Sequence, residues 1–485
     1  MSKILSQEVR LSVLAELTPT ENEIEMQAAV IGKLSEALEN HAASSDFPYS
    51  FIAAQGSTGK KQTQLRGASD LDLFVALRKK DFEEILGLED RERTQAIDQL
   101  MEDMVDEWFI PALDSIGAKS LQKAFSQHPY LSLVMADFDV DIVSCFDLTF
   151  SELAEHGPIT AMDRTIHHTE YVANHLSSNL REDVRILKSF ARASHSYGDT
   201  CAVGRMGFTG YAIELLVILK GGFDNALEGL LRLDLAPVDP LDRSLTTLRQ
   251  VPAFKDDHIF IIDPTDTGRN VASSFDARAY RLLKTLGQQV VDSSHKGQTS
   301  QVMNLLLEKP LPKTPLPLWF TKQALVHEFE SDGEVHYTVL RDKLHSLSKR
   351  IVNELMREPT GEDRFGKALS EVYFEGTRFA IGFLVEKTAI SDTHERKGPP
   401  IDLQTAADSF TEAHPNAFER DGHLWVLERR KWTKAKSLVD SLVEENPIEG
   451  LSRVALSDTS VRLQYVMQKY VLAVENEFPI SSVQG

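Results

Sequence analysis

Three aspartates in two short apolar segments are the residues of this sequence most suited to carry chemistry. Asp70 and Asp72 alternate with leucines, and Asp141 lies among apolar residues of a later segment. Because residues i and i+2 of a strand point to one face, Asp70 and Asp72 would lie side by side. Like charges that close repel unless a cation neutralises them, and Mg²⁺ prefers oxygen ligands. If the second segment pairs beside the first, Asp141 completes a site for two metal ions, the arrangement used for in-line displacement at phosphorus.

Two further aspartates compete with Asp141 for the third position. Asp137 and Asp139 precede it at the same spacing, so all three would face one way on a straight strand. Spacing alone does not choose among them. By itself an Asp-x-Asp pattern also fits a solvated strand face, so the metal interpretation needs a second signal.

The second signal is a glycine-serine pair upstream of the first two aspartates. Gly56 and Ser57 follow an apolar run at 51–54 that reads as a strand. A glycine at this position lets backbone amides approach a phosphate, and the serine hydroxyl can donate to one. The same loop offers Lys60 and Lys61 to a triphosphate. The combined pattern favours a metal-dependent reaction of a nucleoside triphosphate.

The elements that must position these residues alternate between strand and helix signals, which predicts an α+β chain. Thr20 and Glu23 form a capping box before a helix. Four strands and three helical stretches follow, with four prolines at 310–317 read as a linker. The expected strands are 51–54, 69–77, 131–135 and 138–145, and the helical stretches are 81–116, 183–192 and 211–219.

Composition narrows the class of protein. The chain has 485 residues, enough for about three domains. Its 52 basic and 73 acidic residues give a net charge of −21, which argues against non-specific coating of nucleic acid but leaves room for a local basic cleft. Only two cysteines occur, Cys145 and Cys201, and we find neither a signal peptide nor a membrane span. We therefore expect a cytoplasmic protein without membrane contact.

Longer segments resemble a known family. The stretch GSTGKKQTQLRGASDLDLFV resembles the active-site signature of the DNA polymerase β-like nucleotidyltransferases, and more narrowly the archaeal-type (class I) CCA-adding enzymes. The resemblance covers most of the chain in order and is specific over its first 280 residues. Further matching segments are HPYLSL, VDIVSCF, GPITAMDRTIHHTEYVANHL, DVRILKSFARASHSYG, GFTGYAIELL, DPTDTGRNVASSF, KGPPIDL and DGHLWVLERRKW.

The resemblance implies an architecture and an activity. It implies a nucleotidyltransferase head with a mixed sheet at 1–155, a helical nucleotide-recognition neck at 156–309, and an α/β body and tail at 310–485 that bind tRNA. The implied reaction is attack of the tRNA 3′-hydroxyl on the α-phosphorus of CTP or ATP, with Mg²⁺ as cofactor and pyrophosphate released. Oligomeric state stays open, with a homodimer as one option.

The family motifs also assign roles to individual residues. They favour Asp141 over Asp137 and Asp139 as the partner of Asp70 and Asp72 in metal binding. The remaining residues implied to contact the nucleotide are Gly56, Ser57, Lys60, His168, Lys188, Tyr197 and Arg269, the last reading the base. Without the motifs, these side chains have ordinary interpretations as surface lysines, a core histidine, a packed tyrosine and a solvated arginine. We read Glu214, inside an apolar helix, as structural and in need of a partner.

Some features depart from the family pattern. The loop between Ser57 and Asp70 is one residue longer than usual, Gln64 replaces a tryptophan, and Ser144 replaces a proline. The departures leave open whether C, A or both are added. The loop also resembles oligoadenylate synthases, so one alternative is an enzyme that makes a signalling oligonucleotide, and a second is a non-catalytic RNA-binding protein. The basic residues that we expect to grip RNA, with a solvated face as their alternative interpretation, are Arg429, Arg430, Lys431, Lys434 and Lys436.

Overall fold

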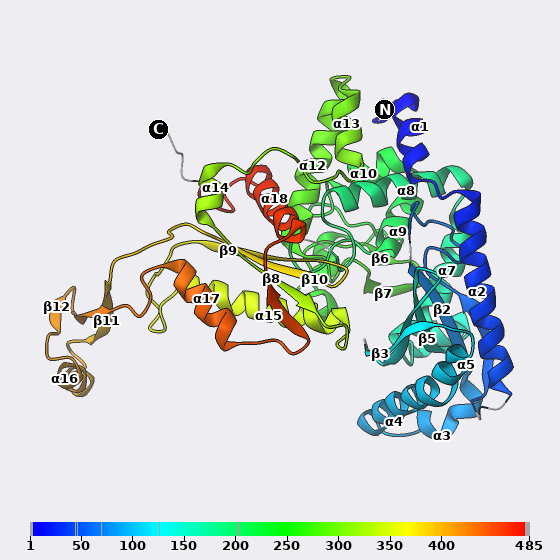
Figure 1. The fold of residues 1–485 in the computed structure, drawn as a ribbon, viewed down its shortest axis with the longest axis horizontal. Helices are drawn as coiled ribbons and strands as arrows, with labels where there is room; N and C mark the ends of the chain where they lie inside the picture. The colour runs from blue at the N-terminus through cyan, green and yellow to red at the C-terminus, as the bar shows by residue number, and fades with distance from the viewer. Residues whose placement is uncertain are drawn as a thin grey trace. The chain divides into compact units, whose positions relative to one another are not determined.

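The computed structural model describes residues 3–43, 45, 47–68, 70–125, 127–200 and 203–480, so Ser69 and Cys201 lie outside the described residues. The chain divides into two compact units (Figure 1). The first comprises Met1–Gly198 and Gly207–Glu308, and the second comprises Asp199–Met206 and Lys309–Gly485. The further division of the first unit into head and neck stays a prediction.

The first unit begins with helices that flank a sheet and continues with a largely helical half. Its strands are β1 (Tyr49–Ala54), β2 (Asp70–Arg78), β3 (Lys119–Phe125), β4 (Pro129–Met135), β5 (Phe138–Asp147), β6 (Ile262–Asp263) and β7 (Asp266–Asn270). Its α-helices are α1 (Gln7–Leu17), α2 (Glu21–Ala42), α3 (Glu83–Leu86), α4 (Asp90–Asp103), α5 (Ile110–Asp114), α6 (Phe150–His156), α7 (Arg164–His175), α8 (Ser178–Ala193), α9 (Gly210–Lys220), α10 (Phe223–Leu230), α11 (Leu245–Arg249), α12 (Ala277–His295) and α13 (Thr299–Leu306). Short helical turns span Lys79–Phe82, Ala161–Asp163 and Pro252–Phe254, and a π-helical stretch spans Met104–Phe109.

The main sheet of the first unit is mixed and has the strand order β1-β2-β5-β4-β3. Strands β2 and β5 are parallel neighbours at its centre, whereas β1 pairs antiparallel with β2 and β4 antiparallel with β5. The 3.3 to 3.4 Å rise of a strand keeps paired residues level across the sheet. The N-terminal ends of β2 and β5, which carry the aspartates, therefore lie next to each other.

The two faces of this sheet are buried by different elements. The odd-numbered residues of β2 from Leu71 to Leu77 pack in a large core with α2 and the α4–α5 segment. On the opposite face, Phe74 and Ala76 pack with Met162 and Ile166 from the start of α7 and the turn before it. Because side chains alternate along a strand, Asp70 and Asp72 share this second face. The carboxylates thus lie beyond the edge of a small apolar cluster, on the side that carries α7.

Most residues of helices α8 and α9 are buried, and several of the buried residues are polar. Ser177 and Thr209 cap them, each accepting a hydrogen bond from a backbone amide of the first turn. Gly221 ends α9 in the left-handed conformation that glycine adopts without strain. The expected buried helix at 211–219 is confirmed. The buried polar residues of these helices, such as Lys188 and Glu214, therefore face protein groups.

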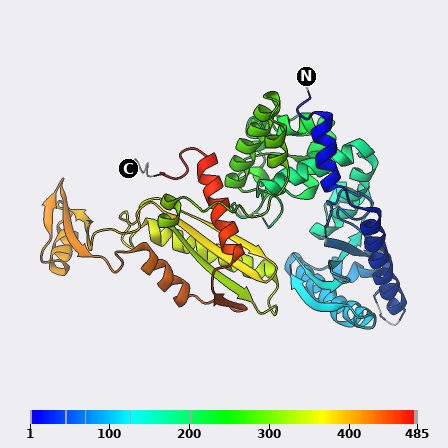
Figure 2. The same cartoon turned by 45° about the horizontal axis from the view of Figure 1, so that its top comes forward.

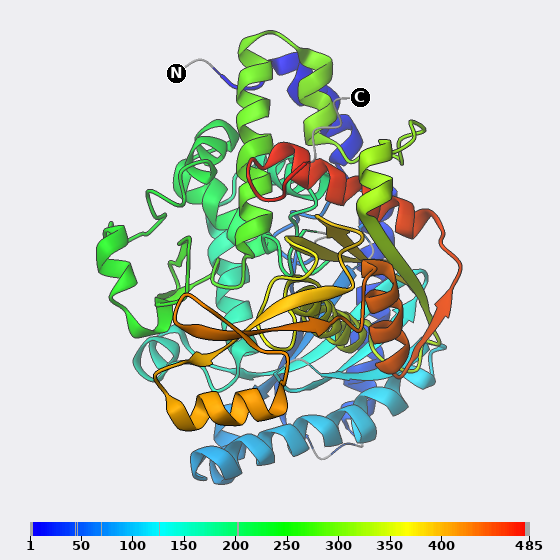
Figure 3. The same ribbon diagram turned by 90° about the vertical axis from the view of Figure 1, so that its left-hand side faces the viewer.

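The second unit contains an antiparallel sheet of order β14-β8-β10-β9 and a smaller sheet of order β11-β13-β12. Helices α15 and α17 bury one face of the larger sheet, and α18 packs on the other (Figure 2). Helix α16 lies along β11 of the smaller sheet (Figure 3). The bounds are α14 (Leu318–Gln323), β8 (Ala324–Ser331), α15 (Tyr337–Met356), β9 (Ala368–Glu375), β10 (Arg378–Val385), β11 (Thr393–Pro400), α16 (Gln404–Ala413), β12 (Phe418–Arg420), β13 (His423–Arg429), α17 (Ala435–Glu445), β14 (Leu451–Val454) and α18 (Asp458–Ala473).

Most elements expected from the sequence are present. The capping box at Thr20 and Glu23 opens α2, and the α+β class with a mixed sheet is confirmed. The edge strand β3 was not expected, because its sequence KSLQKAF shows no clear alternation and most of it stays outside the core. Among the residues described, none of the helices is long and apolar enough to cross a membrane.

Candidate active site

The three predicted aspartates meet on neighbouring strands. In the parallel pair β2/β5, Asp72 lies directly opposite Asp141 and Asp70 opposite Asp139. Asp137 lies in the turn before β5 with a φ of 66°, so it does not belong to the strand. On the other side of β5, Ser132 of β4 is level with Asp141 and hydrogen-bonds its carboxyl group. Register thus separates Asp141 from Asp137 and places it beside Asp72.

Burial and mutual repulsion make these carboxyl groups hard to ionise. Burial, and next the nearby Asp70 carboxylate, raise the pKa of Asp72 to about 6. Burial raises the pKa of Asp141 to about 7, with Asp72, Asp70 and Asp139 contributing and the Ser132 hydroxyl opposing. A positive charge at this place would reverse the effect, because it favours the ionised forms. The electrostatics therefore fit a cation-binding site.

The donor set fits a divalent cation in chemistry and in position. Carboxylate oxygens are the ligands of hard cations, and the opposing register brings two of them to one face. Within the part of the chain that the structure describes, no three acidic, histidine or cysteine side chains are already gathered at ligand spacing. Closing the site on an ion thus requires rotation of side chains, while the strands already hold the correct register.

A glycine brings the upstream loop against Asp72. Gly56 has a φ of 63°, and a Cβ atom at this position would overlap the Asp72 carboxylate. The amide of Gln55 donates to the Asp72 carbonyl at 2.8 Å, and the amide of Thr63 donates to the Ser57 carbonyl at 2.9 Å. Ser57 is half-buried, and Lys60 on the same loop is exposed. Only glycine permits this close approach of the loop to the carboxylate.

Behind the loop lies a buried cluster of two lysines and one glutamate. Glu214 of α9 pairs with Lys188 of α8 at 2.8 Å and with Lys61 at 3.1 Å, and the Thr63 hydroxyl donates to it at 2.5 Å. Although burial opposes it, the neighbouring Lys188 and Lys61 ammonium groups lower the pKa of Glu214 to about 2. The expected partner of Glu214 is thus found. Two ammonium groups share one carboxylate, so the cluster carries a surplus positive charge.

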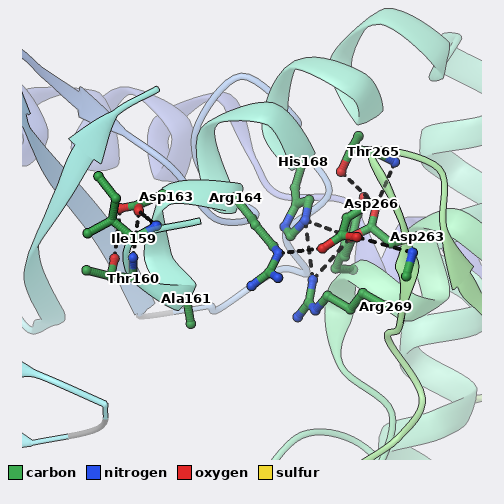
Figure 4. Close-up of polar contacts among 12 residues, drawn as sticks. Ile159, Thr160, Ala161, Asp163, Arg164, His168, Asp263, Thr265, Asp266 and Arg269 are labelled. Atoms are coloured by element: carbon green, nitrogen blue, oxygen red, sulfur yellow. Dashed lines mark hydrogen bonds and ion pairs between the residues drawn. The ribbon is translucent and has the colours of Figure 1, made fainter. Parts of the chain in front are cut away.

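A second cluster joins His168, Asp263 and Arg269 (Figure 4). Nε2 of His168 lies 2.8 Å from Asp263 Oδ2, and Nη1 of Arg269 lies 3.2 Å from the same oxygen. Tyr211 stacks on the His168 ring, with centroids 4.1 Å apart, and its hydroxyl donates to Asp263 Oδ1 at 2.9 Å. Thr265 donates to the same Oδ1 atom from its amide and its hydroxyl. One buried carboxylate therefore orients a histidine, an arginine and a tyrosine together.

The charges of this cluster follow from its burial. Burial lowers the pKa of His168, while Asp263 opposes the shift. Despite the burial of Asp263, the hydrogen bonds from His168 and Thr265 hold the pKa of its carboxyl group below its ordinary value. The side chain of Arg269 is 39% exposed and keeps guanidinium N–H groups free of the Asp263 contact. Arg269 can therefore present donors to a ligand.

The position of α7, which carries His168, is tied to the central sheet. Asp163 is buried and accepts hydrogen bonds from the amides of Phe146 in β5, Ile159 and Thr160, and from the Thr160 hydroxyl (Figure 4). These contacts join the end of β5 to the start of α7. The second cluster thus keeps a fixed relation to the strand of Asp141.

The predicted residues fall into three groups: the aspartates with the loop at Gly56, the cluster around Glu214, and the cluster around Asp263. Lys61 acts on all three. Tyr197 lies near Glu214 and the aspartates. Burial and next the charge of Glu214, with contributions from Asp70 and Asp72, raise the pKa of its hydroxyl. Lys61 lowers the pKa of both Asp72 and His168 and lies 5.2 Å from the centre of the Tyr211 ring. Sequence reasoning missed Asp263 and Tyr211, although both lie in motifs that it quoted. It had placed Lys188 at the nucleotide, and here that ammonium group is buried against Glu214.

The raised pKa values predict that ionisation of Asp72 and Asp141 lowers the stability of the folded state. The folded state favours protonated Asp72 and Asp141, so their contribution to stability is fully present below about pH 4 and is lost as the pH rises through about 7. At pH 8 without metal, Asp141→Asn should therefore raise the free energy of unfolding by roughly 2 to 4 kcal/mol. The measurement is thermal unfolding in EDTA at pH 5 and pH 8.

Added Mg²⁺ supplies the control for this prediction. It should raise the melting temperature of the wild-type protein at pH 8 and leave Asp141→Asn nearly unchanged, because the variant lacks the charge that the ion neutralises. An Asp141→Asn protein that is less stable than wild type at pH 8 in EDTA would contradict the repulsion between these carboxyl groups.

Comparison with known proteins gives a consistent family. Residues 182–297 match the family model described as tRNA nucleotidyltransferase, second domain. The chain is 30% identical to the CCA-adding enzyme of Pyrobaculum neutrophilum over 427 residues, which cover 86% of this chain and 89% of that protein. It is 27% identical to the CCA-adding enzyme of Methanosarcina acetivorans over 450 residues, 90% of this chain and 89% of that protein.

Solved structures give weaker likenesses. A cytoplasmic RNA terminal U-transferase matches with a TM-score of 0.44 at 14% identity, covering 63% of this chain and 100% of that one. Cid1, described with RNA terminal uridylyl transferase activity, matches with a TM-score of 0.45 at 15% identity, covering 63% and 98%. Scores this low carry no argument, so the assignment rests on the sequence relatives. On that basis, the chain belongs to the family of CCA-adding enzymes.

Proposed function

We propose that this chain adds CMP and AMP from CTP and ATP to the 3′ end of tRNA without a template. The observation that carries the proposal is the parallel register that sets Asp72 opposite Asp141, with Gly56 packed against the Asp72 carboxylate. Asp70, Asp72 and Asp141 are proposed to hold Mg²⁺, which would lower the pKa of the attacking hydroxyl and neutralise the triphosphate. A cytoplasmic location fits the tRNA substrate and the low cysteine content.

The reaction balances as a nucleotidyl transfer. The tRNA 3′-oxygen forms a bond to the α-phosphorus, the bond from that phosphorus to the bridging oxygen of pyrophosphate breaks, and the hydroxyl proton is released to solvent. Asp141, beside Asp72, is proposed to face the attacking hydroxyl. The backbone and hydroxyl of Ser57 and the exposed Lys60 would contact the triphosphate from the loop.

The buried lysines and Tyr197 surround the same space. Lys188 and Lys61 share the single carboxylate of Glu214, so their surplus charge attracts the triphosphate even where the ammonium groups stay buried. Tyr197, whose hydroxyl feels the charges of both Glu214 and Asp72, is proposed to line the space between them.

Base selection is proposed to rest on Arg269. Its planar fork can donate two hydrogen bonds to a base edge, and Asp263 and His168 restrict its orientation. The lowered pKa of His168 disfavours a second positive charge beside Arg269.

In the second unit, the basic residues proposed to grip RNA differ in their availability. Arg430 pairs with Glu358 and Lys436 pairs with Asp440, so their charges are already engaged. The three remaining members, Arg429, Lys431 and Lys434, are exposed at the surface, as is the paired Lys436. We propose that these three contribute most to the phosphate contacts.

The deciding experiment incubates the protein with labelled CTP or ATP, Mg²⁺ and tRNA that lacks its 3′-terminal residues. Defined extension of tRNA by C and A is expected. Products made without RNA would support a signalling oligonucleotide synthase, and absence of any incorporation would support a non-catalytic RNA-binding protein. Asp70→Ala and Asp141→Ala should each abolish incorporation while circular dichroism shows a retained fold. Light scattering of the same samples distinguishes a monomer from a homodimer.

The close approach at Gly56 gives a second prediction. Gly56→Ala should lower kcat/KM by on the order of 100-fold, because the new methyl group displaces the loop from Asp72. Gly67→Ala is the matched control: Gly67 has a similar φ of 70° in the same loop, and a Cβ atom there meets nothing within 4 Å. The control should lose about 1 kcal/mol of stability and keep its kinetics. Equal kinetic losses in the two variants would reject a specific role for Gly56.

Arg269→Lys tests base selection. The lysine keeps the charge but loses the fork, so the ratio of kcat/KM for CTP and ATP against GTP and UTP should fall by roughly tenfold. Arg249→Lys, which alters an exposed arginine of α11, is the control and should leave that ratio unchanged. Unaltered discrimination in Arg269→Lys would show that another group reads the base.

A further inference from the structure

Side chains of helix α8 hydrogen-bond the backbone of the loop from Gly56 to Gln64. Four consecutive carbonyl groups of the loop, from residue 61 to residue 64, each accept a hydrogen bond from a cationic side chain of this helix. The contacts are Arg181 Nε to Lys61 O at 3.1 Å, Arg185 Nη2 to Gln62 O at 2.7 Å, Lys188 Nζ to Thr63 O at 3.3 Å and Arg185 Nε to Gln64 O at 3.0 Å. None of these contacts depends on the side chains of the loop residues.

The sequence of α8 encodes this arrangement. Arg181, Arg185 and Lys188 are spaced i, i+4 and i+7, which places them on one face of the helix. Arg185 is the central member and bonds two of the four carbonyls. Burial, and next the neighbouring Arg181, lower the pKa of Arg185, so the structure holds this cation against a desolvation cost. Its guanidinium group is therefore specifically retained beside the loop.

The loop segment from residue 61 to residue 64 needs contacts from outside the loop to keep its conformation. Gln62 has a φ of 49°, in the left-handed region that non-glycine residues rarely adopt and that persists only where surrounding contacts impose it. Thr63 and Gln64 are buried, so their carbonyl groups would lack partners without α8. Arg185 binds the carbonyl groups on both sides of Thr63 and thereby fixes the strained conformation.

The same segment in turn holds the residues proposed to contact phosphate. The Thr63 amide donates to the Ser57 carbonyl at 2.9 Å, and Gly56, next to Ser57, abuts the Asp72 carboxylate. A shift of the 61–64 segment would therefore move Ser57 relative to the aspartates. The path from Arg185 to Ser57 passes through two hydrogen bonds and the single peptide unit that joins Gln62 to Thr63.

We propose that Arg185 is a positioning residue for nucleotide transfer, which holds the loop from Gly56 to Gln64 in register with Asp72 and Asp141 without touching the nucleotide. The inference rests on the proposed function of this site. Its consequence is that nucleotide binding depends on a helix whose sequence lies more than a hundred residues from the loop in the chain.

The test compares Arg185→Met and Arg185→Lys with the control Arg192→Met. Arg192 lies on the same helix, its side chain is 46% exposed, and it pairs with Glu308 instead of a loop carbonyl. At a temperature where all proteins are folded, Arg185→Met should raise KM for CTP and ATP by on the order of 10- to 100-fold and leave the dissociation constant for tRNA unchanged. Arg185→Lys, with one ammonium for two carbonyls, should fall between it and wild type.

Hydrogen exchange supplies a readout that needs no catalysis. Amides of the 55–66 peptide should exchange faster in Arg185→Met than in wild type or Arg192→Met, while peptides of β2 and β5 stay unchanged. Nucleotide KM within about twofold of wild type, or unaltered exchange in this peptide, would overturn the proposal. If the wild-type protein incorporates no nucleotide, the proposed function fails, and exchange together with equilibrium binding of MgATP still decides the role of Arg185.

Discussion

The repulsion between carboxyl groups on two parallel strands is the constraint that the rest of the first unit accommodates. Parallel pairing fixes Asp72 opposite Asp141, and burial removes the water that would screen them. A protein under selection for stability alone would place apolar or neutral residues here. The surrounding elements instead preserve the charges: Ser132 hydrogen-bonds Asp141, and Gly56 makes room for the Asp72 carboxylate. A cation bound there, as proposed, would relieve this repulsion, in keeping with stability given up at functional sites.

A surplus of positive charge lies beside this negative pole. Lys61 and Lys188 share Glu214 as their carboxylate partner, and Lys61 influences both Asp72 and His168. In the proposed reaction, the α-phosphate would lie at the aspartates and the outer charge of the triphosphate would face the lysines. Since these cations are already bonded to protein groups, little reorganisation is needed when a nucleotide enters. The arrangement also explains why a glutamate persists inside an otherwise apolar helix.

Features that depend on residues close together in the sequence could be predicted, whereas contacts between residues far apart in the sequence could not. Asp70, Asp72 and Asp141 could be predicted because alternation is local and the strands are adjacent. Spacing alone did not exclude Asp137; the family motifs favoured Asp141, and the structure places Asp137 in the turn before β5. Glu214 was expected to find a partner, but its partners lie 26 and 153 residues away in the chain and no local pattern names them. Asp263 was hidden for the same reason, since its role comes from converging on His168 across the fold. The roles of individual nucleotide-binding residues stay predictions, because contacts to a ligand leave no trace in protein packing.

The acidic composition becomes less puzzling once the location of the cations is known. The chain carries a net charge of −21, yet three of the cations near the proposed site, Lys61, Arg185 and Lys188, are buried and bonded to backbone or carboxylate groups. These three residues bond the loop backbone or Glu214 and are unavailable to RNA phosphates. Affinity for RNA that came mainly from phosphate contacts would require an exposed basic surface, which a net acidic chain provides only locally. Recognition of tRNA by shape and by its 3′ end suits such a chain better, because it demands few charges and allows the product to leave after each round.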